Sequence, residues 1–334
     1  MKLIGNGRLV LTEPIQECPH TPDANPDWQE SVVLYFWEPQ QECYGFFRIG
    51  HEPNRELGAS IVLWKNLWVG GEYYKNCHYV PFADVERFRD GFGGGPTSRY
   101  RFDGKHHWTI TDGDISARLV MEDAHPPFDF LPAQHNLGEV AANHIEAAGT
   151  VTGEVQFRGR SYSISNALAH RDHSWGPRKW ESMRTHRWAP AVFGKNFVTH
   201  AVGMIGPDRT MSRFGFVMRD DTLIIPRSVD IVTLVEADGL TSRGGVVTLT
   251  LESGETIEVV YKPVAPGAFS FHRGYPCNDL LCTVTSGNHT GFGVFESGDN
   301  TLGGKERPTQ ELLISGIIDN GVFPFQRGSS LVRS

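Results

Sequence analysis

The densest group of side chains that could do chemistry lies at residues 170–178, which read His-Arg-Asp-His-Ser-Trp-Gly-Pro-Arg. Carboxyl and imidazole groups are common general acids and bases in enzymes. A carboxyl group kept partly protonated by apolar surroundings, here Asp172, could donate a proton to an alkene or enone carbon. The neighbouring His173 could activate water or abstract a proton. Asp172 and His173 are therefore the expected catalytic pair.

The local chain pattern constrains how these two side chains can act together. Residues 162–169 read as a β-strand, and a strand continuing through residue 174 would point Asp172 and His173 to opposite faces. Both could line one cavity only if a bulge intervenes, and Gly176-Pro177 favours a bend just beyond them. The pairing therefore depends on an irregularity in the strand.

A structural interpretation of the same residues stays open. Arginine and aspartate often form clamps that tie strands together, so Asp172 could serve mainly to hold Arg171 or Arg178. Trp175 could likewise plug one end of a β-barrel. Replacing Asp172 would then unfold the protein and would not impair a chemical step specifically.

The string Arg-Asp-His-Ser-Trp-Gly-x-Arg at residues 171–178 resembles the hallmark of the carotenoid 1,2-hydratase (hydroxyneurosporene synthase) and AttH-like superfamily. His144-Ile145-Glu146, followed by glycines, is similar to its His-x-Glu-x-x-Gly stretch, and residues 291–296 resemble its Gly-x-Gly-x-x-Glu element. The resemblance implies a lipocalin-like protein built from two β-barrel domains. It also makes His144 and Glu296 candidate catalytic residues beside the central pair.

Other residues are candidates for holding a substrate, because they are aromatic or polar and lie near the motif or on strand-like runs. They are Trp175, Arg178, His170, Tyr35 and Trp64. Strand aromatics such as the last two often belong to a core, so both roles stay open for them. No metal site is expected: His170 and His173 would point to opposite faces, and no cysteine lies near them.

The predicted fold class is all-β, with two lipocalin-like antiparallel β-barrel or β-sandwich domains in tandem. Short apolar runs alternate with turn signals such as Asp103-Gly104 and Asp112-Gly113 along nearly the whole chain. The expected domains are residues 1–182, which end in the motif, and residues 183–334. The best candidate for a helix is residues 308–318, which could equally form a strand. Residues 90–96 are glycine-rich but lack the context of a phosphate-binding loop, and predict a surface loop.

The composition of the chain limits the kinds of molecule that it is expected to bind. The chain has 334 residues, a net charge of −8 and no apolar run long enough to span a membrane as a helix. The negative charge argues against nucleic acid and against anionic membrane surfaces as partners. The five cysteines form no paired motif, so free thiols are expected. Without a recognisable secretory leader, a cytoplasmic location is expected.

The function predicted from these observations is a hydratase, lyase or isomerase that works by general acid–base chemistry without a cofactor. Its expected substrate is a hydrophobic terpenoid, steroid or aromatic molecule held in an apolar pocket. Common dinucleotide, phosphate-loop, zinc-protease and serine-hydrolase motifs are lacking. Two alternatives stay open: a lipocalin-like carrier that leaves its apolar ligand unchanged, and a cyclase or Diels–Alderase. A homodimer is possible.

Overall fold

The structure is a computed structural model that describes residues 2–4, 10–11, 14–55, 60–81, 87–88, 90–95, 97–129, 142–180, 183–205, 211–235, 242–264, 267–272 and 275–299. The candidate helix at residues 308–318 lies outside the described residues. Within them, helix is limited to two short 3₁₀ turns, η1 (Pro14–Glu17) and η2 (Pro39–Gln41). No described helix has the length and apolar character needed to cross a bilayer.

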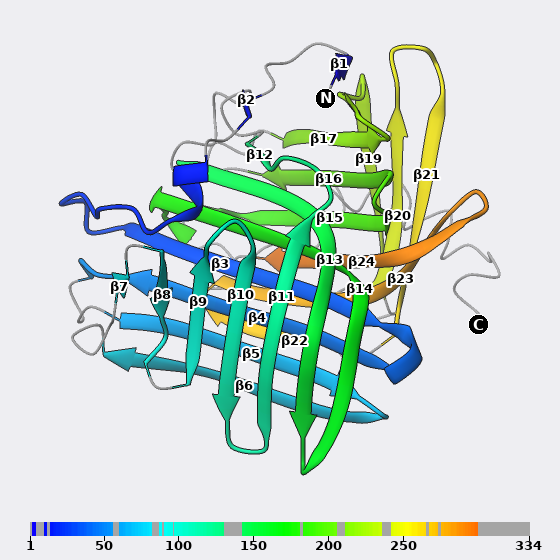
Figure 1. Cartoon of the computed structure of the whole chain (residues 1–334). Coiled ribbons are helices and arrows are strands. Elements are labelled where there is room, and N and C mark those ends of the chain that lie inside the picture. The colour runs from blue at the N-terminus through cyan, green and yellow to red at the C-terminus, as the bar shows by residue number, and fades with distance from the viewer. Residues whose placement is uncertain are drawn as a thin grey trace. The chain divides into compact units, whose positions relative to one another are not determined.

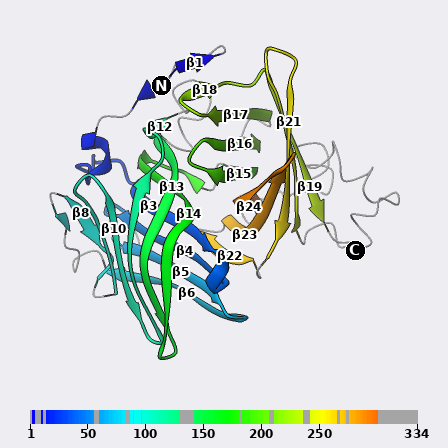
Figure 2. The same cartoon turned by 45° about the vertical axis from the view of Figure 1, so that its right-hand side comes forward.

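The chain divides into two compact units. The N-terminal unit comprises Arg8–Lys179, and the C-terminal unit comprises Trp180–Ser334 together with Met1–Gly7. Strands dominate the described part of each unit (Figures 1 and 2). The all-β prediction is confirmed.

One antiparallel sheet forms the N-terminal unit. Its strands, in spatial order, are β6 (Glu72–Pro81), β5 (Ser60–Val69), β4 (Cys43–Glu52), β3 (Trp28–Glu38), β14 (Arg160–Pro177), β13 (Asn143–Phe157), β11 (Ile115–Asp123), β10 (His106–Asp112), β9 (Ser98–Phe102), β8 (Gly91–Gly93) and β7 (Arg87–Phe88). The short strand β12 (Phe128–Asp129) pairs with both β13 and β2 (Val10–Leu11). Strand β14, which carries the motif, is therefore central, between β3 and β13.

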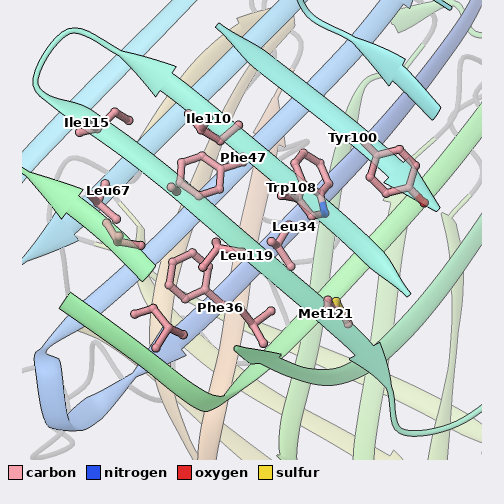
Figure 3. Packing of buried hydrophobic residues seen from close by; sticks show 14 of the residues in the cluster. Leu34, Phe36, Phe47, Leu67, Tyr100, Trp108, Ile110, Ile115, Leu119 and Met121 are labelled. Carbon is pink, nitrogen blue, oxygen red and sulfur yellow. The ribbon is translucent and has the colours of Figure 1, made fainter. Parts of the chain in front are cut away.

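The sheet curls around a core that its two halves share (Figure 3). Phe36 and Phe47, from β3 and β4, belong to the same buried cluster as Trp108 and Leu119, from β10 and β11. Alternation along β10 and β11 explains this packing, since every second side chain on each strand is buried. Below, the face that supplies this core is called the inner face, and the opposite one the outer face.

Two polar contacts fasten the halves of this sheet across its inner face. His51 Nε2 on β4 donates a hydrogen bond to the carbonyl oxygen of Gly93 on β8, at 2.9 Å. The buried Lys65 ammonium on β5 donates to Asp112 Oδ2 on β10, at 2.7 Å. Burial outweighs the opposing effect of Asp112 and lowers the pKa of Lys65.

A second, mostly antiparallel sheet forms the C-terminal unit. Its spatial order is β1 (Lys2–Ile4), β18 (Thr222–Ile224), β17 (Met211–Arg219), β16 (Phe197–Ile205), β15 (Thr185–Gly194), β24 (His289–Asp299), β23 (Tyr275–Ser286), β21 (Thr256–Pro263), β20 (Ser242–Thr250) and β19 (Ser228–Val235). Strand β22 (Ala268–His272) pairs with β23, and among the described strands of this sheet the one parallel pair is β1 with β18. Its core includes Ala189, Val217, Tyr261 and Phe295. All five cysteines of the chain are free thiols.

Candidate functional site

Strand β14 runs through the motif in regular register. Residues Leu168–Pro177 pair one by one with Trp37–Trp28 of β3, and Asn143–Val151 of β13 pair in the same way on the other side. The only register shift with β13 lies farther along, between Val151 and Gly153. No bulge brings Asp172 and His173 to one face. They lie on opposite faces, so the structure does not bring the expected catalytic pair together.

On the outer face, Glu146 of β13 holds two histidines through its two carboxylate oxygens. His170 Nε2 donates to Glu146 Oε2 at 2.6 Å, and His144 Nε2 lies 3.2 Å from Glu146 Oε1. The Glu146 side chain is fully buried. Because antiparallel neighbours share a face, the pairings of Glu146 with Asp172 and of Ala148 with His170 place these groups side by side.

Asp172 completes this group, which we call the outer-face cluster: His144, Glu146, His170 and Asp172. Asp172 Oδ2 lies 3.6 Å from His144 Nε2, and 16% of the Asp172 side chain is exposed. Burial alone would lower the pKa of His144, but the charges of Glu146 and Asp172 outweigh that effect and raise it. His144 is thereby favoured as an imidazolium between two carboxylates, an arrangement that can store and transfer a proton.

Aromatic side chains continue the outer face across β3, β4 and β5. Tyr35, opposite His170, stacks on Phe46 with ring centroids 4.5 Å apart, and Phe46 contacts Trp64 edge-on at 6.0 Å. The Arg48 guanidinium lies 4.6 Å from the centre of the Trp64 ring. The structure thus places three of the substrate-binding candidates, His170, Tyr35 and Trp64, on the same face as Asp172.

Another substrate-binding candidate, Arg178, lies beyond the end of β14. Its Nη1 donates to Ser174 Oγ at 3.4 Å, and the same hydroxyl contacts Gln29 Nε2 and Ser31 Oγ, each at 3.2 Å. Ser174 shares the outer face with Asp172. Arg178 therefore lies at the border of the outer-face cluster, and its charge opposes protonation of His144.

The odd-numbered motif residues point to the inner face, where they join a buried network of charges. Arg171 donates to both oxygens of Glu17, at 2.7 and 3.0 Å, and to both oxygens of Asp123, at 2.6 and 2.8 Å. Burial would raise the pKa of Glu17, but Arg171 and His173 lower it to about 2. The arginine clamp of the structural interpretation exists, but its carboxylates are Glu17 and Asp123.

His173 belongs to the same network. Its Nε2 donates to Glu30 Oε1 at 3.1 Å, and its Nδ1 lies 3.8 Å from Glu17 Oε2. Burial favours the neutral ring, yet the bonds and charges of Glu17 and Glu30 raise the pKa of His173 to about 9. A fully buried imidazolium cannot accept a proton from water, so this position does not suit the expected role of His173 as a base.

His20 connects the N-terminal segment to this network and to Trp175. Its Nδ1 donates to Glu30 Oε1 at 2.8 Å, and its ring stacks on Trp175 with centroids 4.0 Å apart. Trp175 therefore packs against His20 and His173 on the inner face, away from Asp172. Glu17, Glu30, Asp123, Arg171, His173 and His20 are called the inner-face cluster below.

Glu296 lies in the C-terminal unit, on β24. It forms a short hydrogen bond with His186 Nε2, and the other ring nitrogen of His186 is 2.7 Å from the hydroxyl of Tyr275. Gly298 makes room for this group, because a Cβ there would approach the His186 ring to 2.4 Å. Glu296 is thus part of a separate Tyr-His-Glu group.

Sequence reasoning missed Glu146, which fell within the His-x-Glu element but was not chosen as a site residue. It also missed Glu17, Glu30 and His20, which no local pattern marks. Among the described residues, three groups that each lie within a single unit have donors close enough to hold a metal ion: His20, Glu30 and His173; Glu17, His106 and Asp123; and, in the C-terminal unit, His186, Cys277 and Glu296.

The sequence model of a domain of unknown function, DUF7064, matches residues 13–301. The chain belongs to the DUF7064 family. A search of curated proteins finds no match for this DUF7064 member.

Solved structures share its fold at low sequence identity. A proposed AttH from Nitrosomonas europaea is 14% identical, covering 90% of this chain and 99% of that chain, with a TM-score of 0.65. CghA is 12% identical, with coverages of 91% and 99% and a TM-score of 0.59. Kievitone hydratase from Nectria haematococca is 8% identical, with coverages of 90% and 97% and a TM-score of 0.60. The resemblance to the AttH-like, lipocalin-like group is confirmed at the level of fold.

Proposed function

We propose that this DUF7064 chain is a hydratase-type lyase that adds water to, or removes it from, a hydrophobic alkene. The observation that carries the proposal is His144, held between the carboxylates of Glu146 and Asp172 beside a face lined with aromatic rings. The name of kievitone hydratase, a structural neighbour, supports the reaction class by analogy. The acid–base role moves from the Asp172–His173 pair to Asp172 with His144.

In the proposed reaction, Asp172 exchanges protons with the substrate and water, because its side chain is the most exposed of the three ion-paired groups. A proton held by Asp172 and His144 passes to one alkene carbon, and the π electrons form the new C–H bond. Water attacks the other carbon and returns a proton to Asp172. The balance is one water added across one double bond, and it requires no redox partner.

Glu146 acts in this proposal as a positioning residue. Its two oxygens fix both His144 and His170, and its charge keeps a proton available on His144. Tyr35, Phe46 and Trp64 would offer flat apolar surfaces to a terpenoid, steroid or aromatic substrate.

The test is incubation of the purified chain with prenyl, steroid and phenylpropanoid alkenes in H₂¹⁸O. Incorporation of ¹⁸O into a product, lost in Asp172→Asn and retained in Asp114→Asn, supports the hydratase. Asp114 is a suitable control because its side chain is 65% exposed. Tight binding of an alkene without turnover, unchanged in Asp172→Asn, would favour the carrier instead. Rearrangement without ¹⁸O incorporation would favour a cyclase.

A further inference from the structure

The inner-face cluster contains three metal-binding side chains that converge on one point. His20 comes from the segment before β3, Glu30 from β3 and His173 from β14. Glu30 Oε1 lies 2.8 Å from His20 Nδ1 and 3.1 Å from His173 Nε2. One donor atom from each of the three residues lies within 4.8 Å of the other two.

These separations are close to those of a tetrahedral metal site. Nitrogen and oxygen ligands bind zinc at ~2.0–2.2 Å, which places neighbouring ligands of a tetrahedron ~3.3–3.6 Å apart. The two separations from Glu30 Oε1, 2.8 and 3.1 Å, therefore need to lengthen by less than ~1 Å for an ion to fit. Two imidazoles and one carboxylate, with an open position for water, are moreover a ligand set found in divalent metal sites.

The surroundings of the three donors also resemble the outer shell of a metal site. The second ring nitrogen of His173 faces Glu17 Oε2 at 3.8 Å, as a carboxylate commonly faces the far nitrogen of a metal-bound histidine. The backbone N–H of His20 donates to both oxygens of Glu30, at 2.9 and 3.2 Å, and orients that carboxylate. Trp175 fixes the plane of the His20 ring by stacking.

The charge of the cluster and the access to it from solvent also suit a divalent cation. Histidines that bind a metal ion are neutral, so the cluster would then hold three carboxylates, Glu17, Glu30 and Asp123, and one guanidinium, Arg171, which leaves two negative charges to offset. A divalent cation would supply both. His20 has 24% of its side chain exposed, whereas Glu30 and His173 have none, so an ion and a water ligand could enter from the His20 side.

We propose that His20, Glu30 and His173 form a binding site for a divalent cation of the zinc class, with water as the fourth ligand. The site joins the segment before β3 to β14. It stands apart from the proposed hydratase chemistry, because these side chains point to the inner face. It also revises the expectation of no metal, which considered His173 but not His20.

The experiment uses the full chain, freed of metal by a chelator and titrated with Zn²⁺ by calorimetry and with Co²⁺ by visible absorption. We expect one equivalent of saturable binding, a tetrahedral Co²⁺ spectrum without a thiolate band, and a higher melting temperature with Zn²⁺. His20→Gln keeps a hydrogen-bond donor for Glu30 but removes the imidazole, and should weaken binding by ~100-fold or more, since even outer-shell changes cost 10–100-fold.

The matched control is His107→Ala. His107 is 39% exposed and pairs with Asp103 in a hairpin, so its loss should leave metal binding unchanged. Melting and circular dichroism of metal-free His20→Gln confirm that this variant folds. The proposal is overturned by the absence of saturable binding, or by equal affinity in wild type and His20→Gln. A Co²⁺–thiolate band that Cys277→Ser removes would also overturn it, because the ion would then be held by His186, Cys277 and Glu296.

Discussion

Asp172 and His173 are consecutive in the chain, yet their side chains leave opposite faces of β14 and belong to two separate clusters. Asp172 joins His144 on the outer face, while His173 is enclosed with Glu17 and Glu30 on the inner face. The motif therefore serves two purposes in alternate positions. Its odd-numbered residues hold the N-terminal segment to the sheet, and its even-numbered residues offer groups for chemistry.

Replacing Asp172 by asparagine should lower turnover by ~10²–10⁴, the usual contribution of general acid–base catalysis. The melting temperature should change little, because the side chain is partly exposed and its nearest ion-pair partner, His144, lies 3.6 Å away. Steady-state kinetics and thermal melting measured on one preparation check this. A large loss of stability would show that Asp172 is mainly structural.

Replacing Glu146 by glutamine should shift the pH dependence of the reaction. Loss of the Glu146 charge removes a cause of the raised pKa of His144, so that pKa falls. If protonated His144 supports turnover, the alkaline limb of the pH–rate profile moves to lower pH in this variant. An alkaline limb that stays in place would separate His144 from the proton transfer.

Replacing Arg171 by methionine should cost ~3–5 kcal/mol of unfolding free energy, because it leaves the Glu17 and Asp123 carboxylates without their guanidinium partner. Urea unfolding measures the loss. The control is Arg158→Met, whose side chain is 56% exposed and pairs with Glu72 at the surface, and which should change stability little. Similar losses in both variants would argue against the buried clamp.

The inner-face cluster should stabilise the metal-free chain most between pH 4.5 and 6.5. The pKa values of Glu17 and Glu30 fall from 4.5 to about 2, so their contribution is present above pH 4.5 and is lost towards pH 2. The pKa of His173 rises from 6.5 to about 9, so its contribution is complete below pH 6.5 and is lost as pH rises through 9.

Thermal melting across this range checks the prediction, with His173→Gln as the diagnostic variant. This variant should melt at a lower temperature than wild type at pH 6. Its melting temperature should also fall much less than that of wild type between pH 6.5 and 9. An alkaline decline of wild-type size in the variant would assign that decline to other groups.

Local sequence patterns were sufficient to predict much of the fold. The Asp103-Gly104 and Asp112-Gly113 signals correctly mark the turns that flank β10, and both glycines have positive φ. The alternation through residues 170–174 also follows from the strand pattern alone, and the observed register confirms it.

Local sequence patterns do not show which residues far apart in the chain contact each other. Glu17 and Arg171 are separated by 154 residues, so only the folded sheet reveals that they pair. The glycine-rich stretch at residues 90–96 was expected to be a surface loop, but Gly91–Gly93 forms the buried strand β8. A Cβ at Gly91 would lie 2.1 Å from the carbonyl oxygen of Tyr100, so glycine here permits close packing of the backbone against β9.

The pairing of β3 with β14 has a consequence for synthesis on the ribosome. Strand β3 is complete once residue 38 is made, but one of its two neighbours is not available until residues 168–177 emerge. In the interval, the apolar run Val32–Trp37 has an open edge that another nascent chain could join. Production of this protein should therefore be sensitive to pauses in translation between β4 and β14 and to chaperones that cover exposed strand edges.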